Sequence, residues 1–203
     1  RLVIERLQWI AIDMDTSAVQ MVFMALSYML AFAIMIIVPK KFLNMKVTRD
    51  SLGLRGLPTW TDILLSPVGC ILSLAVSLVV MYVIRAYIPG IDWSEAQDVG
   101  FNNVISGIDK IITFVALVIL APIAEELIFR GFLYGKLRTR LSAVPAIILV
   151  SILFGFVHGQ WNVGIIAAIM SIFMCLAREI TGTIYAGILI HMIRNGLAFY
   201  LYL

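Results

Sequence analysis

The sequence predicts an all-α fold, a polytopic membrane helix bundle of about six visible transmembrane helices. Three observations carry this prediction. Of 203 residues, 62% are hydrophobic and only 13% are charged, whereas soluble domains are about 45–50% apolar and about 25% charged. The mean hydropathy is +1.03. Long apolar runs, several of about the 20 residues that a bilayer core requires, alternate with short polar segments.

The first two spans follow an amphipathic start. Residues 1–17 mix apolar and charged side chains, which predicts an amphipathic or juxtamembrane segment. Residues 18–38 predict the first span, which we expect Pro39 to end. Residues 63–87 predict the second span. The loop between them should be cytoplasmic by the positive-inside rule, because it carries the basic residues Lys40, Lys41, Lys46, Arg49 and Arg55.

The third helix is predicted to be longer than a bilayer is thick. The loop at 88–107 precedes it, contains three acidic residues and no basic one, and is expected on the outer side. The helix begins near Asn103, and Pro122 should kink it. Its inner end is marked by Lys136, Arg138 and Arg140. Part of this helix should therefore project beyond the hydrocarbon core.

The last three spans are predicted at residues 144–157, 163–177 and 183–203. We divide the chain into an amphipathic start at 1–17, N-terminal helices and loops at 18–110, and a helical core at 111–203. The net charge of +3 is small and spread over loops, so it indicates orientation rather than binding to nucleic acid. Cys70 and Cys175 both lie in apolar runs and are expected to be small buried residues.

Ionisable residues inside the third helix are the first sign of function. Glu125, Glu126 and Arg130 lie in or beside an apolar run, where a charged residue costs about 2.5–3.5 kcal/mol on insertion scales. Glu126 and Arg130 are four apart, so they share a helix face and can pair. Glu125 is rotated by about 100° from Glu126 and is left free. The pair alone would also fit a purely structural role in helix packing.

The later spans add further polar residues. The only two histidines, His158 and His191, lie in or at the end of apolar spans. Phe154 precedes His158 by four residues, and Asn195 follows His191 by four, so each pair shares a helix face. A single buried histidine is usually structural. Several costly polar groups in one bundle tend to face one another, which predicts one functional site.

These residue types are suited to hydrolysis of an amide. A glutamate and a histidine can hold and deprotonate a water, while a second histidine and an asparagine can donate hydrogen bonds to an oxyanion. Alternatively Glu125, His158 and His191 could bind zinc, which would itself acidify the water. The sequence lacks a His-Glu-x-x-His helix and a Gly-x-Ser-x-Gly elbow. A serine protease is a weak option, because no special context surrounds the span serines Ser66, Ser73, Ser77, Ser151 and Ser171.

Three motifs then carry a family resemblance. They are Glu125-Glu126-x-x-x-Arg130, Phe154-x-x-x-His158 and His191-x-x-x-Asn195, in this order on successive helices. Together they resemble the motifs of the CAAX protease and bacteriocin-processing (CPBP) family of intramembrane proteases, which includes the type II CAAX prenyl endopeptidases. The resemblance covers about residues 111–203, which would then be the catalytic core.

The resemblance implies a role for each motif residue. Glu125 would be the general base that activates water, assisted by His158, and His191 with Asn195 would form the oxyanion hole. Glu126, Arg130 and Phe154 would be supporting residues. The resemblance also implies a glutamate mechanism that needs no metal, so we favour no cofactor. Zinc bound by Glu125, His158 and His191 stays the alternative.

The expected partners are a lipid bilayer and a peptide or lipidated protein. The predicted reaction is cleavage of a membrane-associated, prenylated or otherwise amphiphilic peptide, in the bacterial cell membrane. Two other classes remain: a non-catalytic bacteriocin-immunity or scaffold protein, and a transporter, which would commonly show repeated halves.

The predicted depths of two site residues in the membrane disagree. His158 lies about 20 Å beyond the predicted inner end of its span, whereas Glu125 is expected to be shallower.

Overall fold

The computed structural model of the protein describes residues 17–42, 46–88 and 107–202. All regular secondary structure in these ranges is helical, so the predicted all-α class is confirmed. The predictions for residues 1–16 and for the acidic loop at 89–106 lie outside the described residues.

The helices follow the predicted order. They are α2 (Ser17–Phe42), α3 (Trp60–Tyr87), α4 (Gly107–Phe114), η1 (Val115–Leu120), α5 (Ala121–Glu126), η2 (Leu127–Tyr134), α6 (Gly135–Leu137), α7 (Ala143–Phe156), α8 (Trp161–Thr181) and α9 (Tyr185–Tyr202). The segments from α4 to α6 form one continuous helix, Gly107–Leu137, in which η1 and η2 are π-helical. We call it the long helix.

Four helices of the described part are long and apolar enough to cross a membrane: α2, α3, the long helix and α8. The long helix has 31 residues and a length of about 46 Å, which exceeds the roughly 30 Å hydrocarbon core as predicted. In contrast, α7 has 14 residues and is only about 21 Å long. The protein is therefore an integral membrane protein, in which α7 and α9 complete the bundle.

One predicted boundary is wrong. We expected Pro39 to end the first span, but α2 continues through Pro39 to Phe42. A proline removes one amide donor, which would otherwise serve the carbonyl four residues earlier. That loss falls in the last two turns of the helix, where Lys40 and Lys41 also complement the negative end of the helix dipole.

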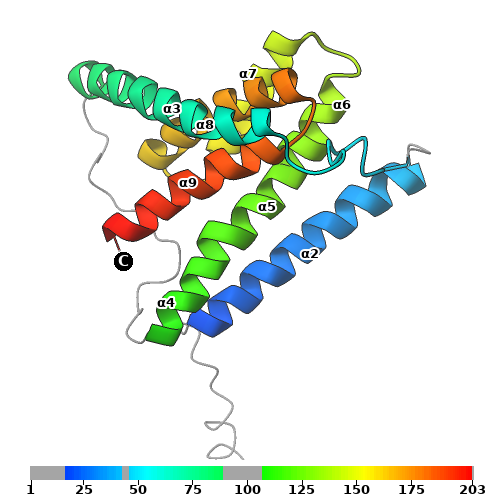
Figure 1. Ribbon diagram of the computed structural model, residues 1–203, viewed down its shortest axis with the longest axis horizontal. Coiled ribbons are helices and arrows are strands. Elements are labelled where there is room, and N and C mark those ends of the chain that lie inside the picture. The colour runs from blue at the N-terminus through cyan, green and yellow to red at the C-terminus, as the bar shows by residue number, and fades with distance from the viewer. Residues whose placement is uncertain (1–16, 43–45, 89–106, 203) are drawn as a thin grey trace, which may run out of the picture.

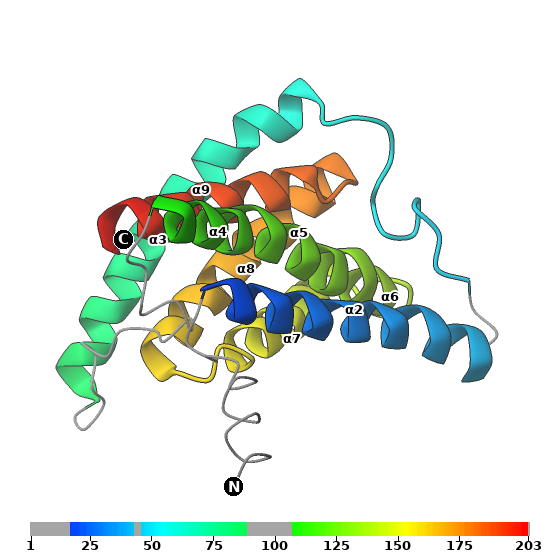
Figure 2. The same ribbon diagram turned by 90° about the horizontal axis from the view of Figure 1, so that it is seen from below.

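The central helix of the bundle is α9, which contacts α3, α8, η1 and α5. Figure 1 shows α9 between α3 and the long helix, and α2 on the far side of the long helix. Seen from below, α2 runs alongside the long helix while α3 crosses the opposite part of the molecule (Figure 2). The contacts of α2 are mainly with α4 and η2, so α2 is a peripheral helix with most of its surface available to lipid.

The start of α9 is fixed by a buried aspartate. Thr59 caps α3 by a reciprocal capping box with Asp62. Asp62 is fully buried, and its Oδ1 accepts a hydrogen bond of 2.7 Å from the hydroxyl of Thr183 in the turn before α9. This link sets the entry point of α9, and hence the position of the polar residues two to three turns further along.

A second anchor at the same end of the bundle is Arg178, in the last turn of α8. Its guanidinium donates to the backbone carbonyls of Arg130 and Gly131 on the long helix and of Ser51 and Leu52 in the segment before α3. The amide of Ile184 also donates to the carbonyl of Gly53. One end of the bundle is thus clamped by residues 51–53. Basic residues that we predicted to be cytoplasmic lie at this end, where one surface hollow is lined by Arg55, Lys136 and Arg138.

Candidate active site

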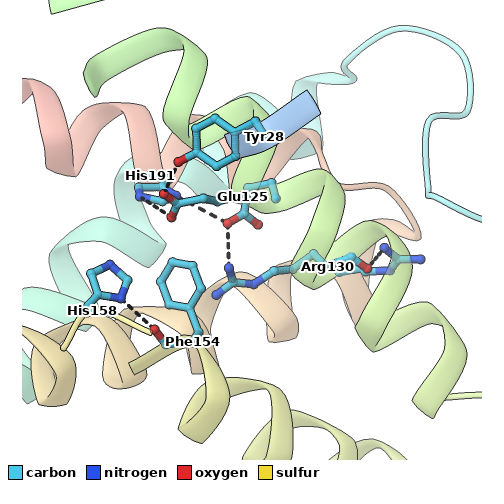
Figure 3. Close-up of polar contacts among 8 residues, drawn as sticks. Tyr28, Glu125, Arg130, Phe154, His158 and His191 are labelled. Atoms are coloured by element: carbon cyan, nitrogen blue, oxygen red, sulfur yellow. Dashed lines mark hydrogen bonds and ion pairs between the residues drawn. The ribbon is translucent and has the colours of Figure 1, made fainter. Parts of the chain in front are cut away.

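A cavity of about 290 Å³ lies between α2, the long helix, α8 and α9. Glu125, His158, His191 and Asn195 all line it, so the structure brings together the four residues that the sequence analysis selected as catalytic. Figure 3 shows the carboxylate of Glu125 close to His191 and Tyr28, with His158 and Phe154 on the other side of an open space.

The two adjacent glutamates have different surroundings. Glu126 Oε1 lies 2.7 Å from Arg130 Nη1, and both side chains are fully buried. The ion pair predicted from their spacing is therefore present. Removing one partner of such a pair typically costs 3–5 kcal/mol, because the other charge stays buried. The Arg130 guanidinium also lies 4.3 Å from the centre of the Phe154 ring, a cation–π contact that fixes its orientation.

Glu125 faces the cavity instead. Its side chain is 22% exposed, and its Oε1 accepts a hydrogen bond of 2.7 Å from the hydroxyl of Tyr28. Tyr28 reaches it from α2, which is 97 residues earlier in the chain. The second oxygen, Oε2, lies 3.9 Å from His191 Nε2. One oxygen of Glu125 is thus held, and the other is directed towards the polar groups of α9.

His191 lies between the two carboxylates. Its Nδ1 is 3.4 Å from Glu126 Oε1, its Nε2 faces Glu125, and the side chain is almost fully buried. The ring also makes an edge contact with Phe154, with ring centres 5.8 Å apart. The imidazole is therefore fixed by neighbours on two helices, and it connects the buried ion pair to the cavity.

His158 follows the C-terminal end of α7. Its Nδ1 lies 2.6 Å from the carbonyl oxygen of Phe154. A carbonyl can only accept, so Nδ1 must carry the hydrogen and the neutral ring offers Nε2 as an acceptor. No direct bond joins His158 to Glu125, and both line the same cavity. The arrangement leaves space for a small molecule such as water between them.

Asn195 is oriented by an irregularity in the long helix. In η1 the amide of Ala121 donates to the carbonyl of Ala116, five residues earlier. The carbonyl of Leu117 would take its π-type bond from Pro122, which has no amide hydrogen. The side chain of Asn195 donates to this carbonyl at 2.8 Å. Where we predicted a kink at Pro122, the structure has a π-helical stretch just before it. The free carbonyl of this stretch fixes the Asn195 amide with one N–H left over.

The zinc alternative needs three ligands close to one point. Among the described residues, no group of three His, Cys, Asp or Glu side chains is placed to hold a metal ion. Glu125, His158 and His191 are all described, and they share the cavity without converging as a ligand set. In this arrangement the three side chains do not form a zinc ligand set.

Two cavity residues were missed in the sequence analysis. Tyr28 contacts Glu125 directly, and Arg194 lines the cavity beside Asn195. A signal existed for each, because a tyrosine or an arginine in the middle of an apolar helix needs a polar partner. The sequence did not indicate which partner.

Fold and cavity together define the class, a polytopic membrane protein with polar residues gathered in a cavity between its helices. Residues 107–197 match the family described as Type II CAAX prenyl endopeptidase Rce1-like. The match covers just under half of the chain and confirms the predicted resemblance to this family, whose description is that of a CAAX prenyl endopeptidase. The matched segment contains all three motifs, whereas Tyr28 lies outside it. No curated protein and no solved structure matches the chain.

Proposed function

We propose that the protein is an intramembrane endopeptidase that cleaves a membrane-associated, amphiphilic or prenylated peptide with water activated by Glu125. The observation that carries the proposal is the different placement of the two glutamates. Glu126 is buried and neutralised by Arg130, while Glu125 opens on a cavity that it shares with two histidines and an asparagine. A purely structural ion pair would not need the second carboxylate.

The proposed reaction starts with a water between Glu125 and His158. The Glu125 carboxylate takes a proton from this water as its oxygen bonds to the carbonyl carbon of the peptide. The electron pair of the C=O bond moves to the oxygen. This oxyanion accepts hydrogen bonds from His191 and Asn195, which lie one helical turn apart on α9.

Collapse of the tetrahedral intermediate breaks the C–N bond. Glu125 then returns its proton to the leaving amine, so the products are a new carboxyl terminus and a new amino terminus. The general base should contribute about 10²–10⁴ to the rate, and one oxyanion donor about 10²–10³. Tyr28 and the Leu117 carbonyl act as positioning groups, the first on Glu125 and the second on Asn195.

The test uses purified protein in lipid vesicles with a library of peptides, some of them prenylated. The wild type is expected to cut one class of peptide, and Glu125→Gln, which is nearly isosteric but cannot act as a base, is expected not to cut. Equal cleavage by both proteins would exclude Glu125 as the base. Absence of cleavage by a folded wild-type protein across the library would favour the non-catalytic immunity or scaffold class.

A further inference from the structure

Arg194 is a cavity residue that the proposed chemistry does not use. It lies near the middle of α9, three residues after His191 and one before Asn195, and lines the same cavity as both. An arginine in this position is costly within an apolar bundle and usually faces a partner or an aqueous cavity. We therefore looked for the group that neutralises the positive charge of Arg194.

The described part of the protein offers Arg194 no ion-pair partner. The ion pairs Glu126–Arg130 and Arg138–Glu179 do not include Arg194, and neither do the contacts of His191 with the two glutamates. Glu125 is the single acidic residue among those that line the cavity. Its oxygens already face Tyr28 and His191. Arg194 is thus a half-buried cation in the wall of a cavity, without a neutralising carboxylate of its own among the lining residues.

We propose that Arg194 is a specificity-determining residue that binds a carboxylate of the peptide substrate. A guanidinium matches the planar geometry of a carboxylate and can hold it by two parallel hydrogen bonds. Three residues of α9 correspond to a rise of about 4.5 Å, so Arg194 lies close to the proposed oxyanion donors. The recognised carboxylate must then lie within a few residues of the scissile bond.

This proposal rests on the proposed function for the site, but its chemistry is separate from the cleavage step. The composition of the cavity wall supports it. The remainder of the cavity wall is mainly apolar, with Leu117, Ile166 and Met170 among its lining residues, and would accept apolar side chains. A peptide with apolar residues and one carboxylate would complement this surface, and would neutralise Arg194 where water cannot.

The test measures binding first, because binding does not require cleavage. The probes are an N-palmitoylated hexapeptide of apolar residues with a free C-terminal carboxylate, the same peptide as a C-terminal amide, and the amide with aspartate as its last residue. Affinities are measured in vesicles with the Glu125→Gln protein, so that no probe is consumed. We expect the free acid to bind at least about tenfold more tightly than the amide, as for a hydrogen bond to a charged group. The aspartate probe shows whether a side-chain carboxylate serves equally.

Substitutions in the same background separate charge from packing. Arg194→Gln is expected to abolish the preference for the acid, and Arg194→Lys to retain part of it, since lysine keeps the charge without the planar fork. Arg85→Gln, which removes an exposed arginine at the end of α3, should leave the preference unchanged. Equal affinity for acid and amide, absence of binding for both, or a preference that survives in a folded Arg194→Gln protein would each overturn the proposal. If instead the preference is found while no peptide is cleaved by the wild type, the anion site stands and the proposed protease activity fails.

Discussion

Replacing Gly187 by alanine should disturb the buried ion pair without touching either charged residue. Gly187 lies on α9 directly against Glu126, and an added Cβ would be 2.7 Å from Glu126 Oε2. Real Cβ atoms essentially never approach another heavy atom so closely. Glu126 has little freedom to move, because its other oxygen is bonded to Arg130 at 2.7 Å and it has no exposed surface.

The expected magnitude follows from a matched pair of variants. Overpacking of a well-packed core costs about 1–3 kcal/mol, whereas Gly→Ala in a helix interior is worth about 1 kcal/mol in propensity. Gly196 is on the same helix, and a Cβ there would meet Val118 at an ordinary contact distance of 3.6 Å. Both Gly187→Ala and Gly196→Ala gain the same helix propensity, so this gain cancels when the stabilities of the two variants are compared. Gly187→Ala should therefore be less stable than Gly196→Ala by about 1–3 kcal/mol.

Thermal unfolding of the two variants in the same lipid or detergent provides the assay. For a chain of this size, 1 kcal/mol corresponds to about 2–4 °C in Tm, so a difference of roughly 2–12 °C is expected. Gly187→Ala should also cleave more slowly, since it displaces the carboxylate that contacts His191. Equal Tm values for the two variants would refute the close packing of Glu126 against α9.

Three further predictions follow from individual contacts. Tyr28→Phe should lower kcat by about tenfold to a hundredfold, the loss of a hydrogen bond to a charged group, with KM unchanged. It should have no added effect in Glu125→Gln, and an equal effect there would contradict a role through Glu125. Arg178→Gln should lower the free energy of unfolding by more than about 2 kcal/mol, because it removes a charged donor from several carbonyls, while the exposed Arg55→Gln should change it by less than about 0.5 kcal/mol. Cleavage should persist after dialysis against a metal chelator, and loss that zinc restores would contradict the metal-free proposal.

Spacing along a helix predicted a good part of the site. The four-residue interval between Glu126 and Arg130 placed both on one face, and the structure contains their ion pair. The same rule applied to His191 and Asn195, which both line the cavity. These predictions succeeded because helix geometry is local and the cost of unpaired polar groups in an apolar bundle is high.

Contacts between different helices could not be predicted from residue spacing along one helix. Tyr28 meets Glu125 across 97 residues, and no local pattern in α2 identifies its partner. The bond from Asn195 to Leu117 depends on the π-helical stretch before Pro122. A proline predicts a disturbance but does not specify which carbonyl is left free, and that depends on how the turn before it relaxes.

The expected difference in depth between Glu125 and His158 does not keep them apart in the structure. The long helix ends at Leu137. Glu125 is then about 18 Å from the inner end of its helix, and His158 about 22 Å from the start of α7 at Ala143. These two distances are similar, and the two residues line a common cavity.

In the proposed reaction Glu125, and not its neighbour or another acid, supplies the base. The most direct measurement is the single-turnover rate of peptide cleavage in vesicles for Glu125→Gln and for Glu179→Gln, a matched control whose carboxylate pairs with Arg138 away from the cavity. Glu125→Gln should cleave about 10²–10⁴ times more slowly than the wild type, and Glu179→Gln within a few-fold of it. A Glu125→Gln protein that cleaves as fast as Glu179→Gln would exclude Glu125 as the base.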